Sequence, residues 1–227
     1  MLNIDFSQPL LAIDCGTSVM SLGVCVNHQR FEINQNIGAK QSENLLPALR
    51  DLYAQVGIDT PDLVAIVFNQ GPGAFTGLRV GIGVAQGLAA AFDIPLIGVP
   101  SLDALAYSLP PSPCVLAAID ARMGEVFYAF FDTVKQQRLS DYCVGRANDI
   151  KLPEQQSQCL VVGNIKLSGC LNVIDYIEKM PTANNFLSLA TTGRYPASTA
   201  EKASLLYVRN KIALTVGEQI ALKDSKK

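Results

Sequence analysis

Tryptophan is absent from this 227-residue sequence, and histidine occurs once, as His28. A nucleophilic triad needs a base beside its nucleophile, and His28 falls in a predicted hairpin turn between Asn27 and Gln29, so no histidine-based triad is expected. Charge is also scarce, because 18 basic and 20 acidic residues leave a net charge of −2. Since phosphate neutralisation supplies most non-specific affinity for nucleic acid, we do not expect the chain alone to bind nucleic acid tightly.

The six cysteines form no Cys-x-x-Cys pair, and several lie in apolar stretches. With a single histidine available, a zinc site is not expected, and buried free thiols in a reducing compartment are the simpler interpretation. The first residues show no basic segment followed by an apolar stretch, and no uninterrupted apolar run reaches the length of a membrane span. We therefore expect a cytoplasmic protein with no metal site of its own and no membrane association.

Hydrophobic residues make up 49% of the sequence, which is enough for a real core, and their spacing predicts strands that alternate with helices. The predicted strands of the first half are 10–14, 21–26, 31–36, 63–68 and 96–99, and the predicted helices are 45–56, 77–92 and 101–107, with Asn44, Thr76 and Ser101 at helix starts and Gly57 at a helix end. After the proline-rich linker 110–113, strands are predicted at 114–120, 125–131, 160–162 and 172–176, and helices at 185–190 and 200–206.

An antiparallel meander that feeds parallel crossovers is typical of the ribonuclease-H-like fold and of its duplicated form in actin-like ATPases and sugar kinases. The second half begins as the first does, with an apolar strand that ends in an acid and a turn, but it is too short to repeat the whole first half. The sequence therefore predicts an α/β fold of two lobes, with residues 1–109 in the first lobe and residues 114–227 in a reduced second lobe.

The stretch from Gly71 to Arg79 reads Gly-Pro-Gly-Ala-Phe-Thr-Gly-Leu-Arg and joins the strand 63–68 to a helix. Gly71 and Gly73 favour a tight turn and Thr76 marks a helix start, so free backbone N–H groups would lie at the carboxyl end of a strand. Open α/β sheets hold ligands or partners at this place. A purely steric strand-to-helix turn is the alternative interpretation.

Two loops stand where an actin-like kinase binds phosphate. Asp14, Gly16 and Thr17 fit a first phosphate loop, in which backbone amides and a hydroxyl hold phosphate and the aspartate handles magnesium. Taken alone, so short a pattern favours plain hairpin chemistry. At the second loop the bulky Arg122 should fill the cleft or pair with Asp120, and no glycine-rich adenosine loop follows. These features disfavour an active ATPase.

A ribonuclease-H-like nuclease is the other catalytic option. It would hold two metal ions with three carboxylates, of which Asp14 and Glu43 could supply two. Asn69 and Gln70 stand where the third should be, and neither is charged. The sequence therefore disfavours an active nuclease as well.

The two long helices of the first half offer the best candidates for a partner surface. Leucines recur along 45–56 at intervals of three and four, and 77–92 holds two rows of small residues, Gly77-Gly81-Ala85 and Gly83-Gly87-Ala91. Each glycine weakens a helix by ~1 kcal/mol relative to alanine, so close backbone approach must compensate. We expect one row to face the sheet and the other a partner helix. The predicted partner-binding residues are Leu45, Leu46, Leu49, Leu52, Tyr53, Gly83 and Gly87.

Together these motifs resemble the TsaB (YeaZ) family, the glycoprotease-like partner subunits of bacterial tRNA threonylcarbamoyladenosine synthesis. The matching segments follow one another in the right order along most of the chain: Asp14–Ser18, Ser42–Pro47, Gly71–Arg79, Asp120–Val126 and Tyr207–Arg209. The third and fourth of these are the specific ones. The sequence departs from the family at Gln41, where a histidine is expected, and matches only loosely over 147–196.

This resemblance implies a role rather than a reaction. It implies a scaffold with no catalytic residue and no intrinsic cofactor, whose first two helices bind a TsaD-like catalytic paralogue. The paralogue carries the metal and transfers a threonylcarbamoyl group to N6 of the adenosine beside the anticodon, in tRNAs that read codons starting with A. A TsaE-like ATPase joins the complex and uses ATP.

Under the same resemblance tRNA would be bound only through the complex. Without the paralogue, the same helices could close a homodimer. Two alternatives remain: a small actin-like ATPase or kinase, and a protease, which only the older family name suggests.

Overall fold

The computed structural model describes residues 4–167 and 171–208, which form two sheets. The first sheet has the order β12-β5-β4-β1-β2-β3. It joins an antiparallel meander to two parallel strands and a short edge strand, and its members are β1 (Leu10–Asp14), β2 (Val19–Val26), β3 (Gln29–Asn36), β4 (Ala65–Gly71), β5 (Leu96–Pro100) and β12 (Ala197–Ser198). The meander and the parallel crossovers predicted for the first half are confirmed.

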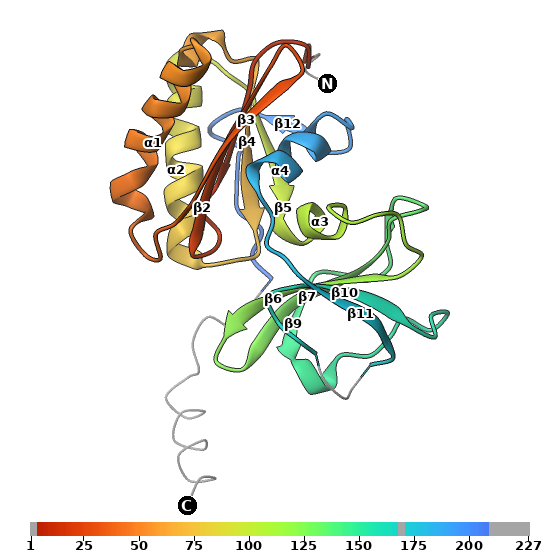
Figure 1. Cartoon of the computed structure of the whole chain (residues 1–227). Helices are drawn as coiled ribbons and strands as arrows, with labels where there is room; N and C mark the ends of the chain where they lie inside the picture. Colours follow the sequence, from red (N-terminus) through yellow and green to blue (C-terminus); the bar gives the residue numbers. More distant parts are fainter. Residues whose placement is uncertain (1–3, 168–170, 209–227) are drawn as a thin grey trace, which may run out of the picture.

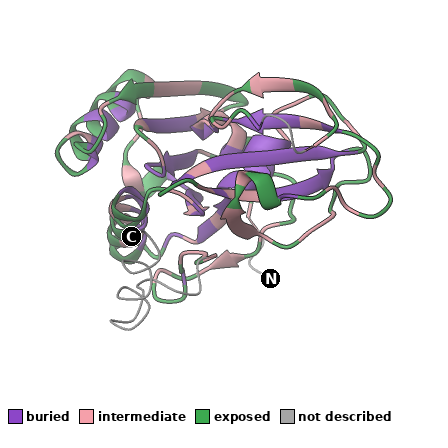
Figure 2. Cartoon of the chain, turned by 90° about the horizontal axis from the view of Figure 1, so that it is seen from below, coloured by how far each residue is buried: buried purple, intermediate pink, exposed green. Residues whose placement is uncertain are grey.

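Helices cover both faces of this sheet (Figure 1). α1 (Gln41–Val56) and α2 (Phe75–Phe92) pack on one face, and α4 (Ala183–Ala190) and the short α3 (Ser101–Ala106) lie on the other. In β4, Ile66 and Phe68 enter the core under α1 and α2, whereas Val67 enters the opposite core. Burial on both faces explains why this strand reads as a continuous apolar run. Figure 2 shows the buried residues concentrated in the strands and the exposed ones in turns and outer helix faces.

The second sheet has the order β11-β10-β6-β7-β8, and β9 pairs with β7. Its strands are β6 (Val115–Arg122), β7 (Glu125–Asp132), β8 (Gln137–Arg138), β9 (Cys143–Arg146), β10 (Cys159–Gly163) and β11 (Val173–Glu178), and the short helices are η1 (Thr60–Asp62) in the first lobe and η2 (Ala147–Asp149) here. Leu102 and Leu105 of α3 share a core with Val115 and Phe131 of this sheet. α3 therefore packs between the lobes.

The chain returns to the first lobe after β11. α4 packs under β1 and β5, and β12 pairs with β5, so residues 183–198 belong to the first lobe. The predicted second lobe, 114–227, is wrong in this part. Chain order could not reveal the return, because Phe186 and Leu187 carry the same apolar signal in either lobe.

The predicted helix 200–206 is also wrong. The backbone groups of this segment bond elsewhere. The Gln86 side chain donates to the Ala200 and Ala203 carbonyl oxygens, and the Leu206 amide donates to the Gln70 carbonyl oxygen at the end of β4 (2.8 Å). These contacts replace the helix ladder. Among the predicted helix starts, Asn44 lies inside α1, which begins at Gln41, and Ser101 and Thr76 are helical residues. Gly57 ends α1 with φ 73°, as predicted.

By length and composition α2 could cross a membrane, although the sequence reading expected no such segment. Within this fold Leu78, Ile82, Ala85 and Ala89 of α2 are buried against the first sheet. A core helix passes the same test of composition.

A buried carboxylate links the two lobes. Asp103 of α3 accepts hydrogen bonds from the Tyr142 hydroxyl of the second lobe (2.6 Å) and from the Tyr195 hydroxyl of the first (2.8 Å). Burial raises the pKa of Asp103, and the two phenol hydrogen bonds oppose that rise. Arg138 lies over the Tyr142 ring at 4.0 Å.

Candidate functional site: a filled phosphate loop and an uncovered helix face

Asp14, at the end of β1, is fully buried and points back into its own loop. Its Oδ1 accepts hydrogen bonds from the Gly16 amide and the Asn69 side-chain amide, each 2.7 Å long. Its Oδ2 is buried without a hydrogen-bond partner among the described residues. Burial raises the pKa of Asp14 to about 6, and the two hydrogen bonds lower it only in part.

The turn from Gly71 to Ala74 covers this phosphate loop. The Ala74 amide donates to the Gly16 carbonyl oxygen (2.7 Å), and a Cβ on Gly73 would lie 2.6 Å from that same oxygen. The Ser101 hydroxyl donates to the Pro72 oxygen from the other side. The glycine turn therefore packs directly against the Gly16 carbonyl group, and its steric interpretation gains support. Gly71 itself has φ 99°, which favours glycine.

Gln41 ties α1 to this loop. The side chain is buried, and its amide donates to the Thr17 carbonyl oxygen. Thr17 keeps its own hydroxyl within the loop by bonding the Val19 oxygen and amide (3.0 Å each). The carbonyl and the hydroxyl of Thr17 are therefore both engaged in hydrogen bonds that stabilise the loop.

A cleft of about 530 Å³ lies between the lobes. Its walls come from the loop Gly16–Ser18, the turn Pro72–Phe75 and the segment Ile119–Arg122, with Leu205–Val208 closing one end. On the second-lobe wall the Arg122 amide donates to Asp120 Oδ1 (2.8 Å), and the guanidinium lies 3.5 Å from Oδ2. Arg122 and Met123 both take positive φ, 66° and 56°, which places two large side chains in a turn where phosphate would need small ones.

The residues present therefore do not fit the nucleotide and magnesium that an actin-like fold implies. Both candidate phosphate loops are engaged, one by the glycine turn and the other by the Asp120–Arg122 pair. Among the described residues, no cluster of three or more histidine, cysteine or carboxylate side chains is arranged to hold a metal ion.

Most of the leucine stripe of α1 is not a free surface. Leu45, Leu49 and Leu52 are 0%, 3% and 0% exposed, and Tyr53 is 8% exposed. All four belong to the core between α1, α2 and the first sheet. The prediction of Leu45 and Leu52 as partner-binding residues is corrected, because hydrophobic spacing of three and four marks first the side of a helix that packs on its own sheet. Leu49 and Tyr53 are mostly buried as well, but both also line a surface pocket.

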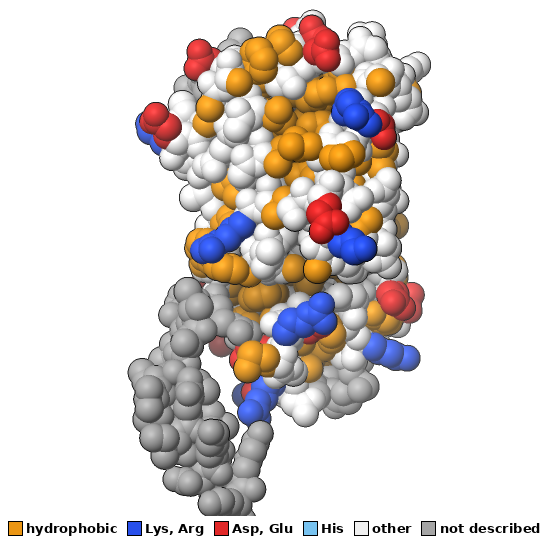
Figure 3. Space-filling view, turned by 90° about the vertical axis from the view of Figure 1, so that its left-hand side faces the viewer, with side chains coloured by type: hydrophobic (Ala, Val, Ile, Leu, Met, Phe, Trp, Pro, Cys, Tyr) orange, Lys and Arg blue, Asp and Glu red, His pale blue; other side chains and the backbone are white. Residues whose placement is uncertain are grey.

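The opposite side of α1 and α2 is apolar and uncovered. Leu46, alone among the predicted leucines, is exposed (55%). Figure 3 looks onto this face, and hydrophobic side chains gather over it. We call it the outer face; its exposed apolar and small residues are Leu46, Gly83, Gly87 and Ala91. The half-buried Val80, Val84 and Leu88 flank them and also pack against the core.

The two glycine rows of α2 face in different directions. A Cβ on Gly77 would lie 1.9 Å from the Cys15 carbonyl oxygen, so this row packs on the sheet as predicted. A Cβ on Gly83 or Gly87 would meet nothing within 4 Å. The second row is therefore open to the outside, and its contact with a partner stays a prediction.

At the start of α2, Thr76 and Arg79 are exposed. The Arg79 guanidinium lies 3.8 Å from the centre of the Phe75 ring, which in turn contacts Tyr207 with ring centres 6.1 Å apart. Of the motif Tyr207–Arg209, the last residue lies outside the described residues, as does Cys170. The other five cysteines are free thiols.

Comparison with known proteins identifies the family in which these loops and this helix face occur together. A family model described as "TsaD: tRNA N6-adenosine threonylcarbamoyltransferase" matches residues 35–168. The solved structure of YeaZ from Pseudomonas aeruginosa superposes with a TM-score of 0.80 at 30% identity, covering 88% of this chain and 99% of that one. A Bacillus subtilis protein named "tRNA threonylcarbamoyladenosine biosynthesis protein TsaB" is 31% identical over 68% of this chain and 70% of its own length. The chain belongs to the TsaB/YeaZ family.

Other relatives with the TsaB name match over a shorter stretch. Those of Haemophilus influenzae and Escherichia coli are 36% and 38% identical, and the match covers 59% and 53% of this chain. It spans only 57% and 53% of their own lengths. The YeaZ likeness, in contrast, extends over both sheets and confirms the predicted actin-like, ribonuclease-H-like α/β fold.

Sequence reasoning missed several residues beside the outer face in this TsaB/YeaZ-family chain. Val80, Val84 and Leu88 repeat every four residues, and their row runs beside that of Gly83 and Gly87 on α2. Each is half-buried. Their four-residue spacing is the sequence signal that marks them.

Proposed function

We propose that this chain is a non-catalytic subunit that binds and supports a TsaD-like transferase. The transferase forms N6-threonylcarbamoyladenosine beside the anticodon of tRNAs that read codons starting with A. The observation that carries the proposal is the outer face of α1 and α2, where Gly83 and Gly87 leave open backbone beside the exposed Leu46. Apolar surface of this kind on a folded protein marks an interaction site.

The remaining features support the non-catalytic part of the proposal. Asp14 bonds inward to Asn69, and Arg122 pairs with Asp120. In each pair the carboxylate already has a partner within the chain. In the assembled complex, a TsaE-like ATPase would use ATP and the paralogue would hold the metal, while this subunit would contribute neither. We place the complex in the cytoplasm.

Binding of tRNA would come from the complex. A chain with a net charge of −2 displaces few counterions from a phosphate backbone, so its own affinity should be low and insensitive to salt. Without the paralogue, the outer face could pair with a second copy of the chain, since a self-complementary patch closes a two-fold dimer.

A reconstitution tests the proposal. We expect the chain to bind the TsaD-like paralogue of the same genome in a titration, and threonylcarbamoyl transfer to tRNA to require both proteins. The chain alone should neither hydrolyse ATP nor transfer the group. ATP turnover by the isolated chain that is lost in Asp14→Ala would instead support the small actin-like ATPase or kinase, and transfer that is indifferent to the chain would refute the proposal.

A further inference from the structure

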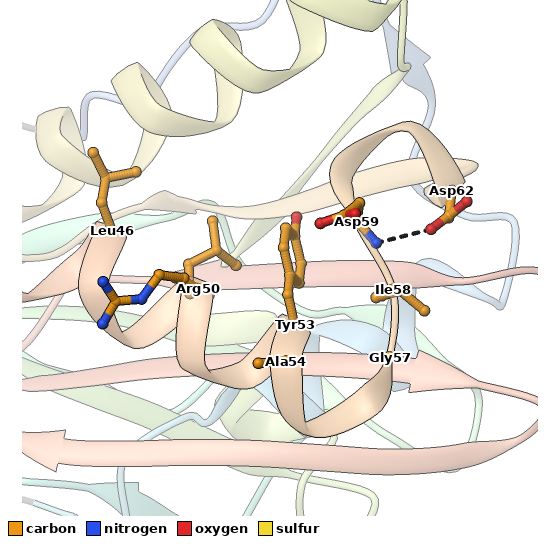
Figure 4. Close-up of a pocket in the computed structure, with 9 residues that line it drawn as sticks. Leu46, Arg50, Tyr53, Ala54, Gly57, Ile58, Asp59 and Asp62 are labelled. Carbon is orange, nitrogen blue, oxygen red and sulfur yellow. Dashed lines mark hydrogen bonds between the residues drawn. The ribbon is translucent and has the colours of Figure 1, made fainter.

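A surface pocket of about 490 Å³ lies at the end of the outer face, between the second half of α1 and the turn η1. Figure 4 shows Leu46, Arg50 and Ala54 entering it from α1, and Asp59 and Asp62 at its other end. Leu46 belongs to both the outer face and the pocket. A protein docked on the outer face would therefore reach the pocket without leaving the surface.

The far end of the pocket is negatively charged. Asp59 and Asp62 cap η1 reciprocally, and Asp62 Oδ2 accepts the Asp59 amide at 2.8 Å. A carboxylate accepts about four hydrogen bonds, so both side chains retain capacity for a ligand. Arg50 is the basic residue of the lining, and its guanidinium is already paired with Asp51 at 3.0 Å.

A tyrosine between the two ends provides an independent sign of a missing ligand. Tyr53 is 8% exposed, and its hydroxyl is buried with no hydrogen bond of ordinary geometry to any described residue, although Thr60 and Asp59 lie near. Burial raises the pKa of Tyr53, the nearby Thr60 side chain opposes the rise and the Asp59 charge adds to it, so the hydroxyl stays protonated. A buried hydroxyl without a partner is unfavourable unless something bonds it.

The geometry points to a lysine or arginine side chain of the docked transferase as the occupant of this pocket. This inference rests on the proposed function. The apolar stem of such a side chain would lie along Leu46, Leu49 and Ile58, which line the pocket, and its cation would reach the two carboxylates and the Tyr53 hydroxyl. Charge complementarity selects a basic side chain over an acidic or purely apolar one. It would fix the register of the partner along α1, which a flat apolar face cannot do.

Neutralising the two acids tests the inference. The double variant Asp59→Asn with Asp62→Asn removes the charge and keeps the turn, because asparagine caps a helix start as well as aspartate does. Titrated with the TsaD-like paralogue at low ionic strength, it should bind about 10-fold more weakly than the unmodified chain, and affinity should fall less steeply with added salt. The matched control is Asp141→Asn with Asp175→Asn, two exposed acids of the second lobe.

A second variant tests the pocket without altering η1, in case the acid substitutions unfold that turn. Tyr53→Phe keeps the packed ring and removes only the hydroxyl, so binding should weaken several-fold while the salt dependence is unchanged. An affinity for the paralogue that is equal in the acid variant, its control and the unmodified chain would overturn the inference and leave the proposed function standing. Weakening of self-association without any effect on the paralogue would also overturn it. If the unmodified chain does not bind the paralogue at all, the proposed function and this inference both fail.

Discussion

The side-chain amide of Asn69 donates a 2.7 Å hydrogen bond to Asp14, across the ends of two neighbouring parallel strands. An aspartate at position 69 would instead have formed a carboxylate pair able to hold a metal ion. The amide turns the end of β1 from a candidate catalytic centre into an internal link of the fold. Burial of the ionised Asp14 carboxylate is nevertheless unfavourable for folding.

This cost gives the first prediction. The pKa of Asp14 is raised from 3.8 to about 6, so between these values the folded state binds more protons than the unfolded state and stability falls as pH rises. In Asp14→Asn this titration is absent. The free energy of unfolding of the variant, relative to the unmodified chain, should improve by about 3 kcal/mol between about pH 3.5 and about pH 7. Urea unfolding across this range measures it, and a difference that does not change with pH would refute the assignment.

The two glycine rows of α2 give a matched pair. Gly77→Ala should destabilise the fold by more than about 2 kcal/mol, because its methyl group would collide with the Cys15 carbonyl oxygen. Gly83→Ala should stabilise it by up to ~1 kcal/mol, because the position is helical and open. Thermal and urea unfolding compare the two. Equal effects would mean that both rows have the same surroundings.

The outer face and the core beneath it respond differently to charge. Gly87→Arg places a cation on the open row, so the fold should survive while affinity for the paralogue drops by roughly 30- to 1,000-fold, or about 2–4 kcal/mol. Leu49→Arg should unfold the chain, because that side chain is 3% exposed. Circular dichroism combined with a binding titration separates these outcomes. Gln137→Arg, on the exposed β8, is the control for added charge.

The last prediction concerns Asp103. Asp103→Ala would leave the hydroxyls of Tyr142 and Tyr195 without their acceptor and should destabilise the chain by about 2–4 kcal/mol. Tyr142→Phe removes one hydrogen bond and should cost about 1 kcal/mol. Denaturant unfolding tests both. A larger loss in the tyrosine variant than in the alanine variant would contradict the proposed arrangement.

Much of the fold could be predicted, because its strands are short apolar runs and α1 ends at a glycine. The direction of the helix faces could not. Leu45 and Leu46 are adjacent leucines that look alike in sequence, although one is 0% and the other 55% exposed. Long-range partners were equally hidden: Tyr142 and Tyr195 lie 39 and 92 residues from Asp103. Only folding brings them to one carboxylate.

The position of α3 has a consequence for association. An enzyme that closes on its substrate needs halves that can swing. Here α3 contributes Leu102 and Leu105 to the core of the second sheet. Its Asp103 accepts a hydrogen bond from one tyrosine of each lobe. These contacts oppose hinge motion between the lobes, so we expect the outer face to keep its shape when a partner binds. A partner that meets it loses little conformational entropy on the subunit's side, so more of the contact energy is retained as affinity.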